Sequence, residues 1–196
     1  MLIVAPDSLL VVTTSILLVF ALCAALVLLL VAFRRPTDVP LLTAVVLVAV
    51  ALVVTAIVPW NVPLPVGLLL ALLATAIAVP GGDPLVRRVF RLTTKGGVRE
   101  GVAGGILVDA ETRNGGEEVE EVLRGGTWIG YLERTGVVLA LIAGYPEALA
   151  IVVAVKGIGR FSELATPAAR ERFLIGTLAS LVWAGLLGAL VRLAIW

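Results

Sequence analysis

Charged side chains that could bind a ligand gather at three places in the C-terminal third of the chain, inside or beside long apolar stretches. Glu133 and Arg134 lie together, Lys156 precedes Arg160 by four residues, and segment 170–172 reads Arg-Glu-Arg. Residues four apart share a helix face, so Lys156 and Arg160 can act on one ligand. The predicted ligand-binding residues are Glu133, Arg134, Lys156, Arg160, Glu171 and Thr177.

The chemistry that this set favours is the binding of an anion. The cations Arg134, Lys156 and Arg160 outnumber the nearby carboxylates, and guanidinium and ammonium groups donate strongly to phosphate. The phosphate of an anionic lipid headgroup is the obvious candidate. Two other interpretations stay open: the cations snorkel to the membrane surface and only fix topology, or they form an ion-pair network that locks three helices together.

Catalytic signatures are missing from the sequence. There is no histidine, which removes histidine bases and the usual zinc sites. The single cysteine, Cys23, lies in the first apolar stretch with no base nearby, and is expected to face lipid or another helix. Glu133 could act as a base after burial, but no paired aspartates for a divalent metal accompany it. We therefore predict no catalytic residue, no metal and no cofactor, and favour a protein that is not an enzyme.

The elements that must position these charges are membrane helices. The chain is 60% hydrophobic with a mean hydropathy of +1.12, and its apolar residues form long uncharged runs, which is typical of transmembrane segments. The predicted fold is all-α: a polytopic transmembrane helical bundle of about six spans with one polar cytoplasmic insertion. The six runs are residues 9–33, 41–58, 66–79, 127–143, 148–161 and 167–196.

The chain divides into a three-helix segment over residues 1–81, a polar loop over 82–126 and a second three-helix segment over 127–196. Pro80-Gly81-Gly82 is expected to end the third run, and 86–92 is expected to form a short interfacial helix. Within the loop the pattern predicts a strand at 106–108, while 117–123 fits a strand or a short helix equally well. Runs four and five are short, so they form a full or a re-entrant hairpin; we favour full spanning.

Loop charge predicts the orientation of the helices. Nearly every basic residue falls in segments 34–35, 87–124 and 156–172, which alternate with loops that hold no Lys or Arg. By the positive-inside rule the basic side is cytoplasmic, so both termini lie outside and only Arg192 is on the outer side. A net charge of +1 favours no nucleic-acid partner. The lipid bilayer is the expected surrounding.

Small residues at four-residue spacing predict close helix packing in the C-terminal half. In lipid, helices associate through close backbone approach rather than through apolar burial. Two alternatives stay open for this packing: it joins helices of one chain, or it joins two copies as a homo-oligomer. The hydroxyls of Thr177 and Ser180 are expected to bond along or across the helix. The predicted packing residues are Gly126, Gly130, Gly176, Ser180, Ala184 and Gly188.

Residues 126–180 resemble an uncharacterised bacterial integral-membrane protein family of unknown function. The segments that carry the resemblance are Ile-Gly-Tyr-Leu-Glu-Arg at 129–134, Lys156 followed by Arg160-Phe161, and the block at 171–180. The family has no assigned reaction, and Gly157 stands where a serine is expected. The resemblance implies a bacterial plasma-membrane location and that Glu133, Arg134, Lys156, Arg160, Gly176 and Thr177 matter.

Two functions from different classes follow. The first is a multi-pass membrane protein that binds or moves an anionic or lipid ligand at the charged inner-leaflet cluster. The second is a structural or assembly partner of another membrane protein, for which the small-residue stripes and the charged loop are the motive.

Overall fold

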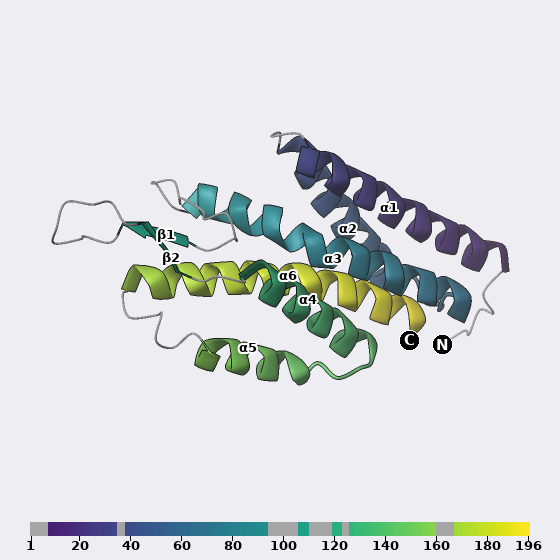
Figure 1. The fold of residues 1–196 in the computed structure, drawn as a ribbon. Helices are drawn as coiled ribbons and strands as arrows, with labels where there is room; N and C mark the ends of the chain where they lie inside the picture. The colour runs from purple at the N-terminus through teal and green to yellow at the C-terminus, as the bar shows by residue number, and fades with distance from the viewer. Residues whose placement is uncertain (1–7, 35–37, 94–105, 110–118, 123–125, 160–166) are drawn as a thin grey trace, which may run out of the picture.

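The computed structural model describes residues 8–34, 38–93, 106–109, 119–122, 126–159 and 167–196. This part of the chain forms six helices and one β-hairpin (Figure 1). The helices are α1 (Ser8–Arg34), α2 (Val39–Ile57), α3 (Leu64–Thr93), α4 (Gly126–Ile142), α5 (Ala148–Gly159) and α6 (Pro167–Ile195). The strands are β1 (Ile106–Asp109) and β2 (Val119–Val122), which pair antiparallel with Ile106 opposite Val122.

Four helices, α1, α2, α3 and α6, are long and apolar enough to cross a membrane, so the chain is a helical membrane protein. The predicted count of about six spans is not confirmed. The two remaining helices have 17 residues (α4) and 12 residues (α5). At ~1.5 Å per residue, α5 is roughly 18 Å long, which is less than a hydrocarbon core of ~30 Å.

The helices are arranged around a central pair. Helices α3 and α6 pack side by side, with α1 and α2 on one flank and α4 on the other (Figure 1). Helix α5 packs chiefly on α4 and has no buried residue. Large apolar side chains cover the outer surfaces of the long helices, as expected of lipid-facing residues, while Leu22, Leu70 and Ile77 fill the interior.

The turn between α4 and α5 reaches the end of the bundle at which α6 ends. Gly144 in this turn has φ +78°, a backbone conformation that glycine adopts without strain. A Cβ at Gly144 would lie 3.1 Å from the guanidinium of Arg192, which belongs to the last turn of α6. The turn that joins α4 to α5 therefore lies beside the last turn of α6.

Helix α3 differs from the sequence prediction. Pro80-Gly81-Gly82 was expected to end the third run, with a separate helix at 86–92, yet one helix continues through Pro80 and Pro84 to Thr93. A proline inside a helix lacks an N–H and leaves the carbonyl four residues earlier without its donor. Contacts with neighbouring helices, described below, hold this segment helical in spite of that loss.

The β-hairpin settles the alternative left open for the polar segment. The first strand lies where it was predicted and extends one residue further, to Asp109. The second segment is a strand at Val119–Val122 rather than a helix. Asn114-Gly115, a pair that favours a turn between two strands, falls outside the described residues.

The small residues of α6 are in contact with α3 and α4 of the same chain. Gly176 lies against Phe90 of α3, and Gly188 lies against Leu141 of α4. Ser180 and Ala184 are buried between these contacts, as is Gly130 on α4, while Gly126 is half-buried at the start of α4. This surface is thus occupied within one chain.

Candidate functional site

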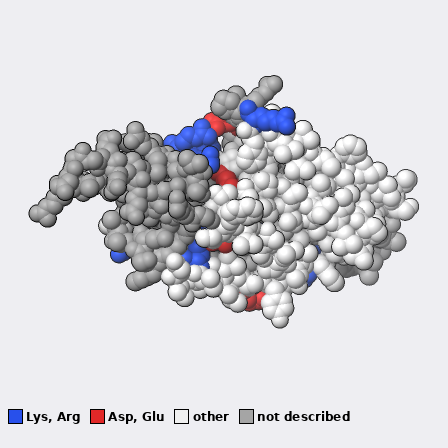
Figure 2. Space-filling model, in the orientation of Figure 1, with Lys and Arg blue, Asp and Glu red and all other residues white. Residues whose placement is uncertain are grey.

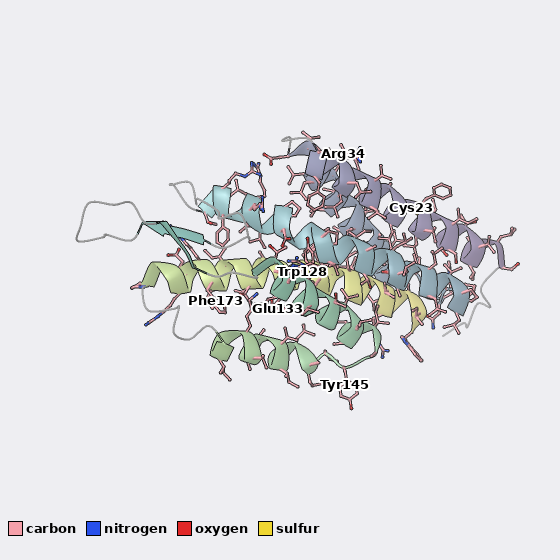
Figure 3. All side chains as sticks on the ribbon, viewed as in Figure 1. Cys23, Arg34, Trp128, Glu133, Tyr145 and Phe173 are labelled. Atoms are coloured by element: carbon pink, nitrogen blue, oxygen red, sulfur yellow. The ribbon has the colours of Figure 1, made fainter. Side chains whose placement is uncertain are left out.

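Two consecutive residues of α4 point into two different helix interfaces. Successive residues on an α-helix are ~100° apart around the axis, because one turn takes 3.6 residues. Arg134 therefore faces α3 and α6, while Glu133 faces α5 (Figure 3). Both belong to the predicted ligand-binding set, and each is ion-paired.

Arg134 is the most deeply buried ion among the described residues, at 2% exposed. Its Nε donates to the carbonyl oxygen of Val79 at 2.7 Å, its Nη1 donates to Ser180 Oγ at 3.2 Å, and its Nη2 donates to Asp83 Oδ1 at 2.8 Å. The guanidinium also lies 5.4 Å from the ring centre of Tyr131. A buried charge is tolerated only when it is paired and hydrogen-bonded, and both conditions hold here.

The segment of α3 that receives Arg134 contains two glycines with different roles. A Cβ at Gly82 would lie 2.5–2.7 Å from the guanidinium and Cδ of Arg134. A Cβ at Gly81 would lie 2.9 Å from Nε1 of Trp183, a side chain of α6 that is 1% exposed. The indole N–H of Trp183 has no partner within the described part of the chain, so this contact joins α3 to α6 by packing alone. Both glycines permit a close approach that any larger residue would block.

Glu133 and Lys156 form the second ion pair. Lys156 Nζ donates to Glu133 Oε2 at 2.5 Å, and the two side chains are only 15% and 11% exposed. The pair joins α4 to α5. The bond fixes α5 to the bundle together with the partly buried apolar side chains of Leu149 and Val152, which pack against the core.

The remaining predicted ligand-binding residues are not brought into this group. Glu171 is exposed on the first turns of α6, and no ion pair joins it to Arg134 or Lys156 in the residues that the structure describes. Thr177 is buried at 6% exposed, one turn before Ser180. Arg160 lies outside the described residues. The predicted cluster is therefore two separate ion pairs, and its missing member is Asp83, which sequence reasoning did not select.

Another ion-paired group, also not selected from the sequence, lies at the start of α2 and the end of α3. Asp38 precedes α2 at the N-cap position, but its carboxylate makes no capping hydrogen bond. It accepts instead from Arg88 and, at 3.0 Å, from Arg91. This group lies at the ends of α2 and α3, whereas Glu133 and Arg134 of α4 lie between helices.

The described residues offer no set of three or more His, Cys, Asp or Glu side chains placed to hold a metal ion. Comparison with protein-family models, with curated proteins and with solved structures found no match. The family resemblance of residues 126–180 thus stays a prediction.

Neutralising Lys156 tests whether the second ion pair holds α5. We expect Lys156→Met to raise hydrogen exchange and proteolysis in α5 while the melting temperature of the four long helices changes little, since α5 packs chiefly on α4. The reversed pair Glu133→Lys with Lys156→Glu should restore protection. Unchanged exchange in α5 of the single variant would show that apolar packing holds this helix without the ion pair.

Proposed function

We propose that this protein is a non-enzymatic, multi-pass membrane protein with a structural or assembly role. In this proposal α5 is the surface that contacts another membrane protein. The observation that carries it is a run of small residues on α5 that none of the residues described by the structure covers. Ala150 and Ala154 are exposed one turn apart, and no described residue outside this stretch of α5 comes within 4 Å of a Cβ built at Gly157.

Small residues four apart allow the backbones of two membrane helices to approach closely. On α6 the equivalent stripe is occupied by α3 and α4, whereas on α5 it faces outward. The apolar side chains beside it, Ile151 and Ile158, are 65% and 78% exposed. A helix of this length that packs chiefly on one neighbour has most of its surface left for a partner.

Binding or movement of an anionic ligand by the predicted cluster has less support. Such a site needs cations whose N–H groups are available to the ligand. Arg134 donates its hydrogen bonds to residues of α3 and α6, and Lys156 is paired with Glu133. These arrangements favour the network interpretation, in which the charges fix α3, α4, α5 and α6 in one geometry.

The proposal places the protein in a bacterial plasma membrane with both termini outside. The ion-paired groups lie toward one end of the bundle, and much of the other half is uncharged (Figure 2). Trp60, Tyr145 and Trp196 lie at the opposite end, in the α2–α3 connection, the α4–α5 turn and the end of α6. Amphipathic rings are enriched at membrane interfaces, and an excess of cations is typical of the cytoplasmic side.

Site-specific cross-linking in native membranes tests this function. Cys23 is replaced by serine, and single cysteines are placed at Ala154 on α5 and, as the matched control, at Phe20 on α1, which is 70% exposed. We expect one discrete protein adduct from position 154 and none from position 20, because position 154 lies on the exposed small-residue run of α5, whereas a large apolar side chain stands at position 20. Mass spectrometry of the adduct distinguishes another protein from a second copy of this chain.

Single cysteines placed at the two ends of the bundle report orientation. Labelling from outside the cell is expected at Tyr145 and not at Glu171.

Equal adduct formation at positions 154 and 20, or no adduct at 154 in native membranes, would contradict the assembly role.

A further inference from the structure

A small cavity lies where α1, α2 and α6 meet the connection between α2 and α3. Its volume is ≈ 10 Å³, which matches the ~10–15 Å³ that the centre of one water molecule needs. A backbone hydrogen bond fixes the connection beside it, since the N–H of Val62 donates to the carbonyl oxygen of Ala194 at 2.8 Å. The polar side chains that line the cavity belong to Thr14, Thr55 and Trp60.

These polar side chains leave hydrogen-bonding capacity unused. The hydroxyls of Thr14 and Thr55 each donate to a carbonyl oxygen of their own helix at 2.8 Å, and a hydroxyl oxygen has two lone pairs with which it can accept. Trp60 Nε1 donates to Thr14 Oγ1 at 3.3 Å, which is longer than the ~2.9–3.0 Å of the commonest N–H···O bonds. Thr55 is only 7% exposed, so bulk solvent does not satisfy its oxygen.

The end of α2 supplies a further acceptor. The last carbonyl oxygens of a helix have no donor within the helix. The residue four places after Thr55 is Pro59, which has no N–H, so the carbonyl oxygen of Thr55 lacks the donor that another residue would supply. Thr55 lies in the last turn of α2, and both it and the C-cap residue Val58 line the cavity. A backbone acceptor thus adjoins the side-chain acceptors.

We propose that this cavity binds one water molecule, which joins α1, α2 and the α2–α3 connection. The water accepts from the indole N–H of Trp60 and donates to oxygen atoms of Thr14 and Thr55. Buried water molecules make about three hydrogen bonds to groups that lack other partners, and these residues offer that number. Tryptophan rings are enriched at the membrane interface, where water can enter such a site.

A dry cavity is the alternative. Cavities that stay dry are lined by apolar groups, and their lining loses dispersion contacts. In this cavity the oxygens of Thr55 would also lack partners, and a buried polar group without a hydrogen bond costs free energy. The apolar side chains of Leu18 and Leu193, which line the cavity as well, offer a water no hydrogen bond. They therefore confine it to the polar residues.

Nuclear Overhauser effects between water and the indole protons test the proposal in the full chain. The protein carries isotope-labelled tryptophan in detergent micelles, and each indole N–H is assigned with a single Trp→Phe variant. We expect Trp60 to show the effect of a long-lived water, separated from proton exchange by a rotating-frame measurement. Trp128 and Trp196, which are 73% and 74% exposed, meet only short-lived surface water and should not show it.

Thr55→Val places a methyl group where the hydroxyl was, so it should abolish the water effect at Trp60. Thr55→Ser keeps the hydroxyl and should retain the effect. Thr43→Val is the matched control, because the hydroxyl of Thr43 also donates to its own helix, to Val39 at 2.8 Å, but lies on the exposed side of α2. Absence of a long-lived water at Trp60 in the wild type would overturn the proposal. Its persistence in folded Thr55→Val would overturn it too, since the water would then lie outside this cavity.

Discussion

Replacing Asp83 with leucine is expected to lower the free energy of unfolding by about 3–5 kcal/mol, the cost of leaving one partner of a buried ion pair alone. The partner left behind is Arg134, whose charged side chain is 2% exposed. Arg134→Leu should cost less, because Asp83 is 27% exposed and can be hydrated when its partner is gone. The specific expectation is that Asp83→Leu lowers the free energy of unfolding more than Arg134→Leu does.

Unfolding in mixed micelles with increasing dodecyl sulfate measures both variants. The double variant Asp83→Leu with Arg134→Leu should recover much of the loss, since two apolar side chains replace a pair without leaving a charge. Asp38→Leu is the matched control: its pairs are with half-exposed arginines, and it should cost no more than about 1 kcal/mol. If Asp83→Leu unfolded like the wild type, Arg134 would have another counter-charge or a hydrated surrounding.

The need for these ion pairs could be inferred from the sequence, but their partners could not. Hydrocarbon disfavours isolated charge, so Glu133 and Arg134 in an apolar run had to pair, snorkel or face water. Helical periodicity places Lys156 near Glu133 once α4 and α5 form a hairpin. For Arg134, however, Asp83, Glu133 and Glu171 were all available at the same end, and a linear sequence does not state which helix faces which.

Asp83 was missed because it was assigned to the polar loop over residues 82–126 and not to a membrane helix. Proline and glycine usually end helices, and Pro80-Gly81-Gly82-Asp83-Pro84 contains only residues that favour turns. In the folded chain Trp183 and Arg134 occupy the space that side chains at positions 81 and 82 would need. The same two glycines would have indicated close helix contact if the segment had been taken as transmembrane. Tertiary contacts thus outweigh local propensity in α3.

The second large effect is expected from Gly82→Ala, a change that local propensity alone would favour. Alanine stabilises a helix interior by about 1 kcal/mol relative to glycine. The new Cβ would lie 2.5 Å from Arg134 Nη1 and 2.6 Å from Cδ. Arg134 cannot swing away, because three hydrogen bonds hold it in the interior. We expect a net loss of about 2–3 kcal/mol from overpacking and broken hydrogen bonds, measured by the same unfolding titration.

A glycine with free space around it provides the control for this substitution. Gly136 lies in α4 with nothing within 4 Å of a built Cβ, so Gly136→Ala should be neutral or stabilising by up to about 1 kcal/mol. The decisive comparison combines Gly82→Ala with the Asp83→Leu, Arg134→Leu background. If the guanidinium is what excludes a side chain at position 82, the cost of the alanine should largely disappear once the arginine is gone. A cost that persists there would mean that the backbone of α3, and not Arg134, sets the limit at Gly82.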